Sequence, residues 1–446
     1  MPSTSWVYRA ALRLGTALVP FLGTLSPKLR RSALARRDAG ERLLEWSRSS
    51  REVTRPLVWF HAASVGEGLQ ADIVLRHLRR LRPDCQIAYT HFSPSAEALA
   101  ARLAVDVADY LPYDLPHSVD RLLSALQPDL LVFAKLDVWP ELATRASTTG
   151  TEVAIVAATV RPGSGRLRWP ARAFLLPGYR VIAAAAAISG DDAARLTQLG
   201  VAPDRVHVLG DPRFDSVIEK VRGIGQSDPL LRFGRGAPTL VAGSTWPPDE
   251  AVLLRAFAAL RHRREARLII VPHEPTDDHL RAIDRNARAA GLPVPVRLSR
   301  AEGPEPLLLV DQVGVLAGLY GAGSMAYVGG GFGSAGLHSV LEPAAWGIPV
   351  AFGPRWANSR DAMLLLERGG GTALPRGGVG QAAAALKKLW EDWIRDEAGR
   401  RAQGAQARQV VEGGLGAAAK SAEMLADLIS SRPLRTSPSG AQLGRR

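Results

Sequence analysis

The stretch VGGGFGSAGLHSVLEPAAWGIPVAFG at residues 328–353 decides the fold prediction. It joins an apolar run to a glycine-rich loop, a helical pattern and a second apolar run, which is the order of a parallel strand–helix–strand unit. Glycine lets the backbone approach a phosphate closely, and free N–H groups at a helix N-terminus attract anions. The loop predicts either a phosphate-containing ligand or simple tight packing, and its glycines are Gly329, Gly330, Gly331, Gly333 and Gly336.

Short apolar runs of the same kind recur along the chain and alternate with helical patterns such as 68–81 and 118–126. This alternation predicts repeated right-handed βαβ units in parallel sheets. A polar stretch rich in Gly and Pro at 221–238 separates the runs into two series. The first series is LVWFHAAS from 57, QIAYTHFS from 86, LLVFAKLD from 130, EVAIVAAT from 152, VIAAAAAIS from 181 and RVHVLG from 205; the second is TLVAGST from 239, RLIIVPHE from 267, LLLVD from 307, MAYVGGG from 325 and IPVAFG from 348.

A chain of 446 residues is too long for one ordinary core, and it suits two domains of roughly 200 residues each. We predict an α/β protein with two doubly wound, Rossmann-like domains that face a central cleft and bind ligands at the carboxyl ends of their strands. The predicted divisions are an N-terminal helical segment at 1–50, a first domain at 51–220, a second domain at 236–430 and a disordered tail at 431–446.

Lys and Arg outnumber Asp and Glu by 56 to 43, for a formal net charge of +13. This excess favours an anionic partner, which could be nucleic acid or acidic lipid. Several basic residues crowd the first 50 positions instead of forming an aromatic-studded patch, which favours a membrane surface. The single cysteine, Cys85, excludes an internal disulfide and, without a signal-peptide pattern, indicates a cytosolic working face.

The N-terminal segment combines an apolar stretch at 6–25 with a basic stretch, KLRRSALARR, at 28–37. Arg9, Arg13 and Pro20 interrupt the apolar stretch, so a membrane-spanning helix is not expected. A helix that lies in the membrane interface, with its arginines near the lipid head groups, suits this pattern. The alternative is an amphipathic helix packed on the first domain.

Two carboxylates follow strands of the predicted sheets. Glu342 lies in the helix after the glycine-rich loop, and together with the Gly353-Pro354 pair it predicts a nucleotide-sugar site in which Glu342 binds ribose hydroxyls. Glu67 follows the run that starts at 57, and Gly66 is expected to turn the chain so that Glu67 projects above the sheet. A carboxylate there could take a proton from an acceptor hydroxyl, or it could only complement a helix dipole.

Several short motifs occur in a specific order: HAASVGE from 61, FSPSAEA from 92, LPYDLP from 111, LDVWPEL from 136, GDPRFD from 210, GST from 243 and GLHSVLEPA from 336. Their order, from about Leu57 to Pro354, resembles the 3-deoxy-D-manno-octulosonate (Kdo) transferases of lipopolysaccharide synthesis. The resemblance implies a GT-B fold, a nucleotide-sugar donor (CMP-Kdo), and the anionic lipid A precursor lipid IVA as acceptor. It also implies an inverting reaction without metal or other cofactor, at the cytoplasmic face of the bacterial inner membrane, with no nucleic acid partner.

The resemblance also assigns site residues. Glu67 matches the general base of the family, and Arg213 stands where the family has a lysine thought to stabilise the transition state. A cation at that position could balance the leaving phosphate or the Kdo carboxylate. Lys135 and Asp137 complete the implied catalytic set. The implied donor-binding residues are Pro272, His273, Val313, Gly314, Val315, Ser339, Val340, Leu341 and Glu342.

This sequence also departs from the family pattern. The family's Glu-Thr-Glu-Leu-Trp-Pro becomes KLDVWP at 135–140, so Lys135 replaces one carboxylate while Asp137 keeps the other. The family's Pro-Arg-His becomes PHE at 272–274, and an Asn beside His338 becomes Ser339. Two alternatives therefore stay open: a GT-B glycosyltransferase that uses another nucleotide sugar on a lipid or glycan, and a non-catalytic membrane or nucleic-acid binding protein.

Overall fold

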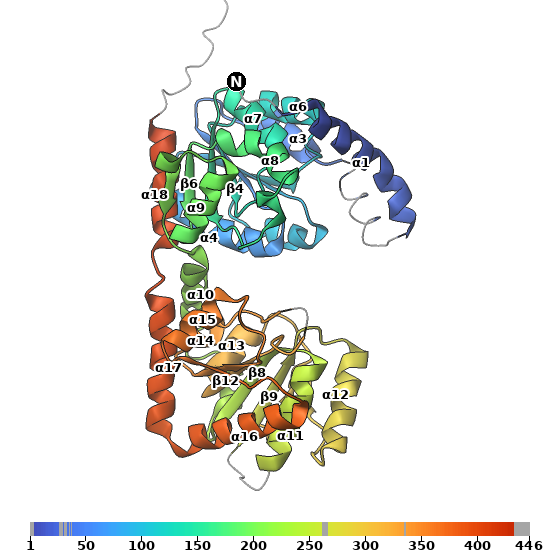
Figure 1. Ribbon diagram of the computed structural model, residues 1–446, viewed down its shortest axis with the longest axis vertical. Coiled ribbons are helices and arrows are strands. Elements are labelled where there is room, and N and C mark those ends of the chain that lie inside the picture. Colours follow the sequence, from blue (N-terminus) through green and yellow to red (C-terminus); the bar gives the residue numbers. More distant parts are fainter. Residues whose placement is uncertain are drawn as a thin grey trace, which may run out of the picture. The chain divides into compact units, whose positions relative to one another are not determined.

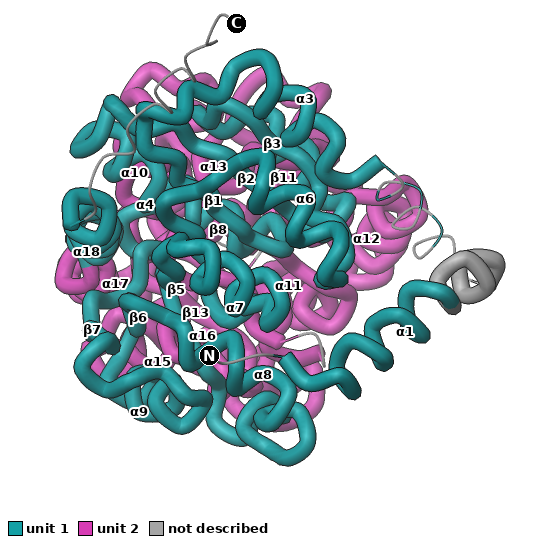
Figure 2. Tube along the Cα trace, turned by 90° about the horizontal axis from the view of Figure 1, so that it is seen from above, with its two compact units in different colours: residues 1–216, 415–446 teal, residues 217–414 magenta. Residues whose placement is uncertain are grey.

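The chain folds into two compact units, shown in different colours in Figure 2. The computed structural model describes residues 4–25, 30, 34, 36, 38–260, 266–333 and 336–431, with side chains left out for 18–25. Unit 1 comprises Met1–Ser216 and Leu415–Arg446, and unit 2 comprises Val217–Gly414. Each unit contains a parallel sheet of seven strands. The prediction of an α/β protein with two doubly wound domains is confirmed, whereas the predicted tail and most of the basic stretch lie outside the described residues.

The sheet of unit 1 has the strand order β3-β2-β1-β4-β5-β6-β7, and all its strand pairs are parallel. Its central strands are continuous apolar runs because helices cover both faces of the sheet. The strands are β1 Leu57–His61, β2 Gln86–His91, β3 Val107–Tyr110, β4 Leu130–Ala134, β5 Glu152–Ala158, β6 Ala184–Ala187 and β7 Val206–Val208.

Alternate residues of each strand point to opposite faces, so unit 1 has two apolar clusters. Leu57 and Trp59 pack with α3, α6, α7, α8 and α9, whereas Val58 and Phe60 pack with α4 and α18 on the other face (Figure 1). The helices are α1 Trp6–Leu25, α3 Glu41–Ser49, α4 Val65–Leu81, α5 Glu97–Ala100, α6 Pro116–Leu126, α7 Pro140–Thr148, α8 Ala171–Arg180, α9 Gly190–Leu199 and α18 Ala417–Ser430, with 3-10 turns at Pro94–Ala96, Gly165–Leu167 and Pro203–Arg205.

The last helix, α18, belongs to unit 1, which differs from the predicted second domain at 236–430. The Asp215 carboxylate accepts hydrogen bonds from the backbone N–H groups of Gly416 at 2.7 Å and Ala418 at 3.0 Å, which caps the start of α18. The apolar side of α18 then lies against α4 in the second cluster of unit 1. Burial of that side, which the linear sequence does not reveal, moves the boundary.

The sheet of unit 2 has the strand order β10-β11-β9-β8-β12-β13-β14. Its strands are β8 Thr239–Thr245, β9 Arg267–Pro272, β10 Val296–Arg297, β11 Leu307–Leu309, β12 Met325–Val328, β13 Val350–Phe352 and β14 Gly371–Ala373. Helix α10, Pro212–Gly223, leads into the unit. The other helices are α11 Pro247–Leu260, α12 Asp277–Ala289, α13 Leu316–Ala322, α14 Leu341–Ala345, α15 Arg360–Glu367, α16 Val379–Arg395 and α17 Glu397–Glu412, with 3-10 turns at Pro229–Gly234 and Leu298–Arg300.

Helix α1 touches the rest of unit 1 at its N-terminal end and then extends away from it (Figures 1 and 2). Its described apolar side chains Trp6, Val7 and Leu14 are 78%, 39% and 65% exposed. Among the helices that the structure describes, none combines the length and hydropathy that crossing a bilayer requires.

Candidate functional site

The strand order of unit 1 reverses between β1 and β4, which pair directly. In open α/β sheets, ligands bind beyond the carboxyl ends of the strands at such a reversal. A cavity of about 430 Å³ lies there. It brings together Glu67, Lys135 and Asp137, three residues that the sequence analysis assigned to catalysis. The complete lining is Glu67, Lys135, Leu136, Asp137, Thr159, Arg161, Pro162, Gly163, Ser164 and Arg166.

Glu67 is held by the start of its own helix. It is the third residue of α4, and its Oε2 accepts hydrogen bonds of 3.0 Å from both the backbone N–H and the hydroxyl of Ser64, which forms a capping box. The expectation that Gly66 turns the chain is wrong, because Gly66 lies inside α4. Within the described part of the chain, the other oxygen, Oε1, makes no hydrogen bond. Glu67 therefore both caps the helix and presents a free carboxylate oxygen at the cavity.

Lys135 stands at the end of β4 in an unusual backbone conformation. Its φ is 60°, a left-handed value that a residue with a Cβ rarely adopts. Its N–H donates to the carbonyl of Val156 at 2.9 Å, so the residue continues the sheet while the chain turns. Strained backbone of this kind persists only where the surrounding structure enforces it and gathers at functional sites. The conformation places Lys135 in the cavity wall.

The cavity carries an excess of positive charge. Arg166 forms an ion pair with Asp137 at 3.3 Å and donates to the carbonyl of Leu136 at 3.2 Å. Lys135 and Arg161, in contrast, have no ion-pair partner among the residues that the structure describes. Three cations thus face two carboxylates, and one of the carboxylates is already paired. The arrangement suits an anionic ligand beside Glu67.

Arg213 is the one predicted catalytic residue of unit 1 that does not line this cavity. It lies in the first turn of α10, and its guanidinium contacts the buried Asp211 carboxylate at 2.6 and 2.9 Å. The Arg213 side chain remains 35% exposed, so it can still meet an anion.

His61 is a buried structural partner at the end of β1, the strand that precedes the helix of Glu67. Its ring is fully buried, its Nδ1 lies 3.0 Å from the hydroxyl of Thr90, and its edge meets the rings of Phe133 and Trp139. Burial lowers the pKa of His61 to about 4, despite the opposing charge of Asp137. The imidazole is therefore neutral at physiological pH and does not add to the cationic charge of the cavity.

In unit 2 the strand order reverses between β8 and β12, and three aromatic rings gather at the carboxyl ends of neighbouring strands. Trp246 follows β8, His273 follows β9 and His338 lies in the glycine-rich segment after β12. His273 and His338 stack with centroids 4.3 Å apart, and the indole N–H of Trp246 donates to His338 Nε2 at 2.9 Å. Because Nε2 accepts, His338 is neutral; burial, followed by the charge of His273, lowers its pKa.

Asp249 ties the glycine-rich segment to α11. This buried carboxylate accepts hydrogen bonds from the N–H of Gly330 at 2.9 Å, the N–H of Trp246 at 3.0 Å and the hydroxyl of Tyr327 at 2.8 Å. Burial raises the pKa of Asp249 in spite of these bonds. The loops after β8 and β12 are therefore joined by one side chain.

Gly331 and Gly353 let two loops of unit 2 touch backbone to backbone. A Cβ on Gly331 would lie 2.7 Å from the Cα of Gly353, a distance that real Cβ atoms do not reach. The glycine pair therefore serves packing between the loops after β12 and β13. This is the alternative that the sequence left open for part of the glycine-rich stretch.

The loop that carries His273 rests on a second polar network. The N–H of His273 donates to the carbonyl of Thr245 at 3.0 Å, and the hydroxyl of Thr245 donates to the buried Glu250 at 2.9 Å. His279 joins Glu250 to this loop, because its Nε2 lies 2.9 Å from Glu250 and its Nδ1 lies 2.9 Å from the carbonyl of Glu274. Burial raises the pKa of Glu250. The backbone of the loop that carries His273 is thus anchored by side chains from α11 and α12.

The remaining predicted donor residues lie on loops of the same unit. Pro272 ends β9, and Val313, Gly314 and Val315 form the turn before α13, where Gly314 has a φ of 86° and Val313 is 79% exposed. Ser339 and Val340 precede α14, and Leu341 and Glu342 are its first two residues. Glu342 is engaged by Lys220 at 2.6 Å, in an ion pair that is partly exposed.

Several residues of both sites escaped the sequence analysis. Arg161 and Arg166 follow β5 in the sequence RPGSGR, whose closely spaced glycines and arginines were an available signal. Asp249 and Glu250 follow a Pro-Pro pair at a helix start and were also visible, but nothing local predicts that they are buried.

No group of three or more His, Cys, Asp or Glu side chains that could hold a metal ion occurs within 4–25, 38–260, 266–333 or 336–431. A reaction without metal stays a prediction.

Comparison with known proteins agrees with these observations. The family model described as 3-deoxy-D-manno-octulosonic-acid transferase (kdotransferase) matches residues 37–216. The 3-deoxy-D-manno-octulosonic acid transferase of Haemophilus influenzae is 27% identical over 69% of this chain and 73% of its own length. The enzyme of the same name from Bordetella pertussis is 29% identical over 68% of this chain and 73% of its own length. The enzyme of the same name from Aquifex aeolicus is 28% identical over 70% of this chain and 80% of its own length.

Solved structures share the fold at much lower sequence identity. A UDP-GlcNAc 2-epimerase from Neisseria meningitidis, solved with UDP-GlcNAc, superimposes with a TM-score of 0.60 at 12% identity, over 84% of this chain and all of that one. A putative UDP-N-acetylglucosamine 2-epimerase from Listeria monocytogenes gives 0.59, again at 12% identity, over 84% and 96%. These likenesses support the predicted GT-B type of fold. The family match over residues 37–216, the relatives and the ordered motifs therefore agree, and they confirm that this chain resembles the 3-deoxy-D-manno-octulosonic acid transferases, which are glycosyltransferases.

Proposed function

We propose that this chain transfers Kdo from CMP-Kdo to a hydroxyl of the lipid A precursor lipid IVA, with inversion at the anomeric carbon. The observation that carries the proposal is the position of Glu67, the residue that matches the family's general base, in a cavity with excess positive charge. Lipid IVA is anionic, so a cavity that presents Lys135 and Arg161 without ion-pair partners in the described chain suits it as an acceptor.

In the proposed reaction, Glu67 acts as the general base. Ser64 holds Oε2, which leaves Oε1 to take the proton as the acceptor oxygen attacks the anomeric carbon of Kdo. The bond between that carbon and the CMP phosphate breaks on the opposite face, so CMP departs without a covalent enzyme intermediate. Arg213 would balance the negative charge that the leaving CMP gains.

The donor-binding residues that we propose lie in unit 2. The stacked rings of His273 and His338 offer an apolar platform with polar edges, and the turn Val313–Val315 and residues Ser339–Glu342 would supply further contacts. His273 stands where the family has an arginine, so a neutral or singly charged ring would here replace a guanidinium.

The deciding experiment compares the wild-type protein with Glu67→Gln in an assay containing a CMP-Kdo generating system and tetra-acylated lipid A precursor, followed by mass spectrometry. Glutamine also serves in a capping box, so its amide oxygen can keep both bonds to Ser64 while its NH₂ group takes the place of Oε1. We expect Kdo-sized mass increments with the wild type and a loss of roughly 10²- to 10⁴-fold in the variant. Full activity of Glu67→Gln would refute the base, and absence of product from active donor would refute the substrates.

The replacement of an arginine by His273 favours one rival function, transfer of a different nucleotide sugar. A thermal-shift comparison of CMP, CDP and UDP separates the two, because a ligand that binds the folded state raises the melting temperature. Stabilisation by UDP but not CMP would favour the rival function.

We also propose that α1 lies in the interface of the bacterial inner membrane, on its cytoplasmic face. At about 100° per residue, Trp6, Val7 and Leu14 fall within one apolar stripe that no described residue covers. Arg9 and Arg13 lie beside this stripe, where their charges could reach anionic head groups. Cosedimentation with anionic and with neutral vesicles tests the proposal, and equal binding to both would remove the role of the arginines.

A further inference from the structure

Two motifs of the sequence, LPYDLP and LDVWPEL, supply one buried carboxylate each, and neither carboxylate lines the cavity. Asp114 comes from the loop before α6, and Glu141 is the second residue of α7. Asp114 is 2% exposed, and Glu141 is fully buried. Two buried carboxylates outside the catalytic set need a reason, because burying a charge is costly unless it is bonded.

Asp114 caps the helix that follows the cavity loop. Helix α7 begins at Pro140, directly after Lys135–Trp139, and its own N-cap residue Trp139 contributes no side-chain hydrogen bond. Instead, Asp114 accepts 2.8 Å hydrogen bonds from the backbone N–H groups of Glu141 and Leu142. The position of the loop that carries Lys135 and Asp137 thus depends on Asp114 at its downstream end.

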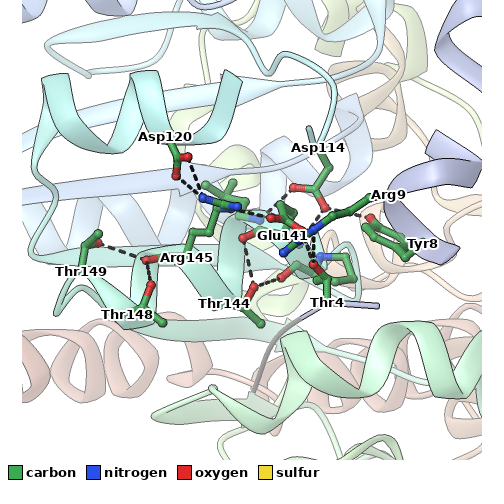
Figure 3. A network of polar contacts seen from close by, with 12 residues as sticks. Thr4, Tyr8, Arg9, Asp114, Asp120, Glu141, Thr144, Arg145, Thr148 and Thr149 are labelled. Atoms are coloured by element: carbon green, nitrogen blue, oxygen red, sulfur yellow. Dashed lines mark hydrogen bonds and ion pairs between the residues drawn. The ribbon is translucent and has the colours of Figure 1, made fainter. Parts of the chain in front are cut away.

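Both carboxylates are also bonded by the beginning of α1 (Figure 3). The hydroxyl of Tyr8 donates to Asp114 Oδ2 at 2.8 Å, and Arg9 Nε donates to Glu141 Oε2 at 3.0 Å. The buried Thr4 hydroxyl contacts the same oxygen of Glu141. On the far side, Arg145 links Glu141 to Asp120. We call Tyr8, Arg9, Asp114 and Glu141 the α1 clamp.

The ionisation of these carboxylates shows that the α1 clamp matters electrostatically. Burial raises the pKa of Asp114 to about 6, although three hydrogen bonds oppose the shift. Burial also acts to raise the pKa of Glu141, but bonds from Thr4, Arg9 and Arg145 outweigh it and lower that pKa. Burial, followed by the charge and the hydrogen bond of Asp114, raises the pKa of Tyr8. The start of α1 thus contacts both carboxylates, and Asp114 joins it to the start of α7, directly after the cavity loop.

From these contacts we infer that Tyr8 and Arg9 are positioning residues, which act through Asp114 and Glu141 to hold the Lys135–Trp139 loop at the cavity. The inference rests on the proposed function for its catalytic consequence. It gives α1 a second role, independent of any contact with lipid. Tyr8 lies about 150° around the helix axis from the centre of the exposed apolar stripe, so one helix can serve both roles at once.

Arg9 and Arg13 provide a matched pair of variants. Both are on α1, one turn apart, and replacement of either by glutamine removes one positive charge from the helix. Arg9 bonds Glu141, whereas Arg13 is exposed and its side chain has no hydrogen-bond or ion-pair partner among the described residues. Arg9→Gln and Arg13→Gln therefore change the net charge of α1 by the same amount, but only Arg9→Gln should disturb the α1 clamp.

The first readout is hydrogen exchange of the full-length protein over residues 135–148. We expect faster exchange in Arg9→Gln and Tyr8→Phe, and wild-type exchange in Arg13→Gln. Tyr8→Phe keeps the ring and removes only the hydroxyl, so faster exchange in this variant cannot be attributed to a general failure to fold. Arg9→Lys, which keeps the charge, should partly restore protection.

The second readout is turnover with detergent-dispersed acceptor, where vesicle binding does not contribute. A displacement of about 1 Å in a catalytic site can cost on the order of 10²-fold. We expect kcat to fall roughly tenfold in Arg9→Gln, with an unchanged KM for the nucleotide sugar, and to stay at the wild-type value in Arg13→Gln.

Equal effects of the two arginine variants on exchange, or unchanged exchange in both Arg9→Gln and Tyr8→Phe, would overturn the inference. If the wild type itself made no product, the proposed function would fail, and exchange alone would decide whether the α1 clamp positions the loop.

Discussion

Replacement of Asp249 should destabilise unit 2 by an amount that depends on whether the new side chain can accept hydrogen bonds. Asp249→Ala leaves the N–H groups of Gly330 and Trp246 and the hydroxyl of Tyr327 without their acceptor. A buried donor without a partner costs about 1–3 kcal/mol, so three of them should cost at least about 3 kcal/mol.

Asp249→Asn should be much milder. Its amide oxygen can take the place of Oδ2 and keep the bonds from Gly330 and Trp246, while its NH₂ group can donate to the oxygen of Tyr327. Because burial raises the pKa of Asp249, the site disfavours the charged form, which asparagine lacks. We expect a cost of about 1 kcal/mol.

Differential scanning calorimetry distinguishes the two variants. For a unit of this size, 1 kcal/mol corresponds to roughly 2–4 °C, so Asp249→Ala should lower the transition of unit 2 by about 6–12 °C or more and Asp249→Asn by about 2–4 °C. Asp278→Ala, a change of an exposed carboxylate in the same unit, should have little effect. Equal losses in Asp249→Ala and Asp249→Asn would mean that the charge, and not the acceptor geometry, stabilises the loop. A loss below about 1 kcal/mol in the alanine variant would mean that the three bonds do not form.

Three further predictions concern pH and packing. Tyr8 and Glu141 face Asp114, and burial raises the pKa of Asp114 in the folded state to about 6, above its ordinary value of 3.8. The folded state therefore binds the proton more tightly than the unfolded state. The stability that Asp114 contributes is fully present below pH 3.8 and is lost as the pH rises through 6. Urea titrations of the wild type and Asp114→Asn give the free energy of unfolding of each protein. The difference between these two free energies should change by up to about 3 kcal/mol between pH 4 and pH 7, and a difference that does not vary with pH would contradict the raised pKa of Asp114. Trp246→Phe removes the donor to His338 Nε2, so the pKa of His338 should rise in an NMR titration, and an unchanged pKa would mean that the bond is absent. Gly331→Ala forces a Cβ against Gly353, so it should lower the free energy of unfolding by about 1–3 kcal/mol in calorimetry and weaken CMP binding in a nucleotide titration. Gly303→Ala has open space around its Cβ and should change neither quantity.

The sheets were largely predictable because their central strands are buried on both faces. Each predicted apolar run contains a strand, and the helical patterns at 68–81 and 118–126 correspond to α4 and α6. The edge strands β3, β10 and β14 were missed. They are two to four residues long and partly exposed, so they lack a continuous apolar run. Three of the four sheet edges therefore carry no periodic signal.

The site was predictable where a motif sits at the end of a strand. Glu67, Lys135 and Asp137 follow β1 and β4, and parallel strands that pair bring such residues to one edge. Arg161 and Arg166 were missed because their contribution depends on the turn after β5, which no periodic pattern encodes. Asp114 and Glu141 stood in motifs without an assigned task, because their partners lie more than 100 positions away along the chain.

The return of α18 to unit 1 has a consequence for synthesis on the ribosome. Ala418, Ala422, Leu425 and Ile429 close the apolar cluster that α4 and the strands of unit 1 leave open. The nascent chain must therefore carry an incomplete unit 1 while all of unit 2 is translated, and unit 2, which begins later, can finish folding first. Domains made of one continuous segment fold in the order in which they emerge. Here the sheet that emerges first is completed last, and one of its apolar faces stays partly uncovered until α18 has been made.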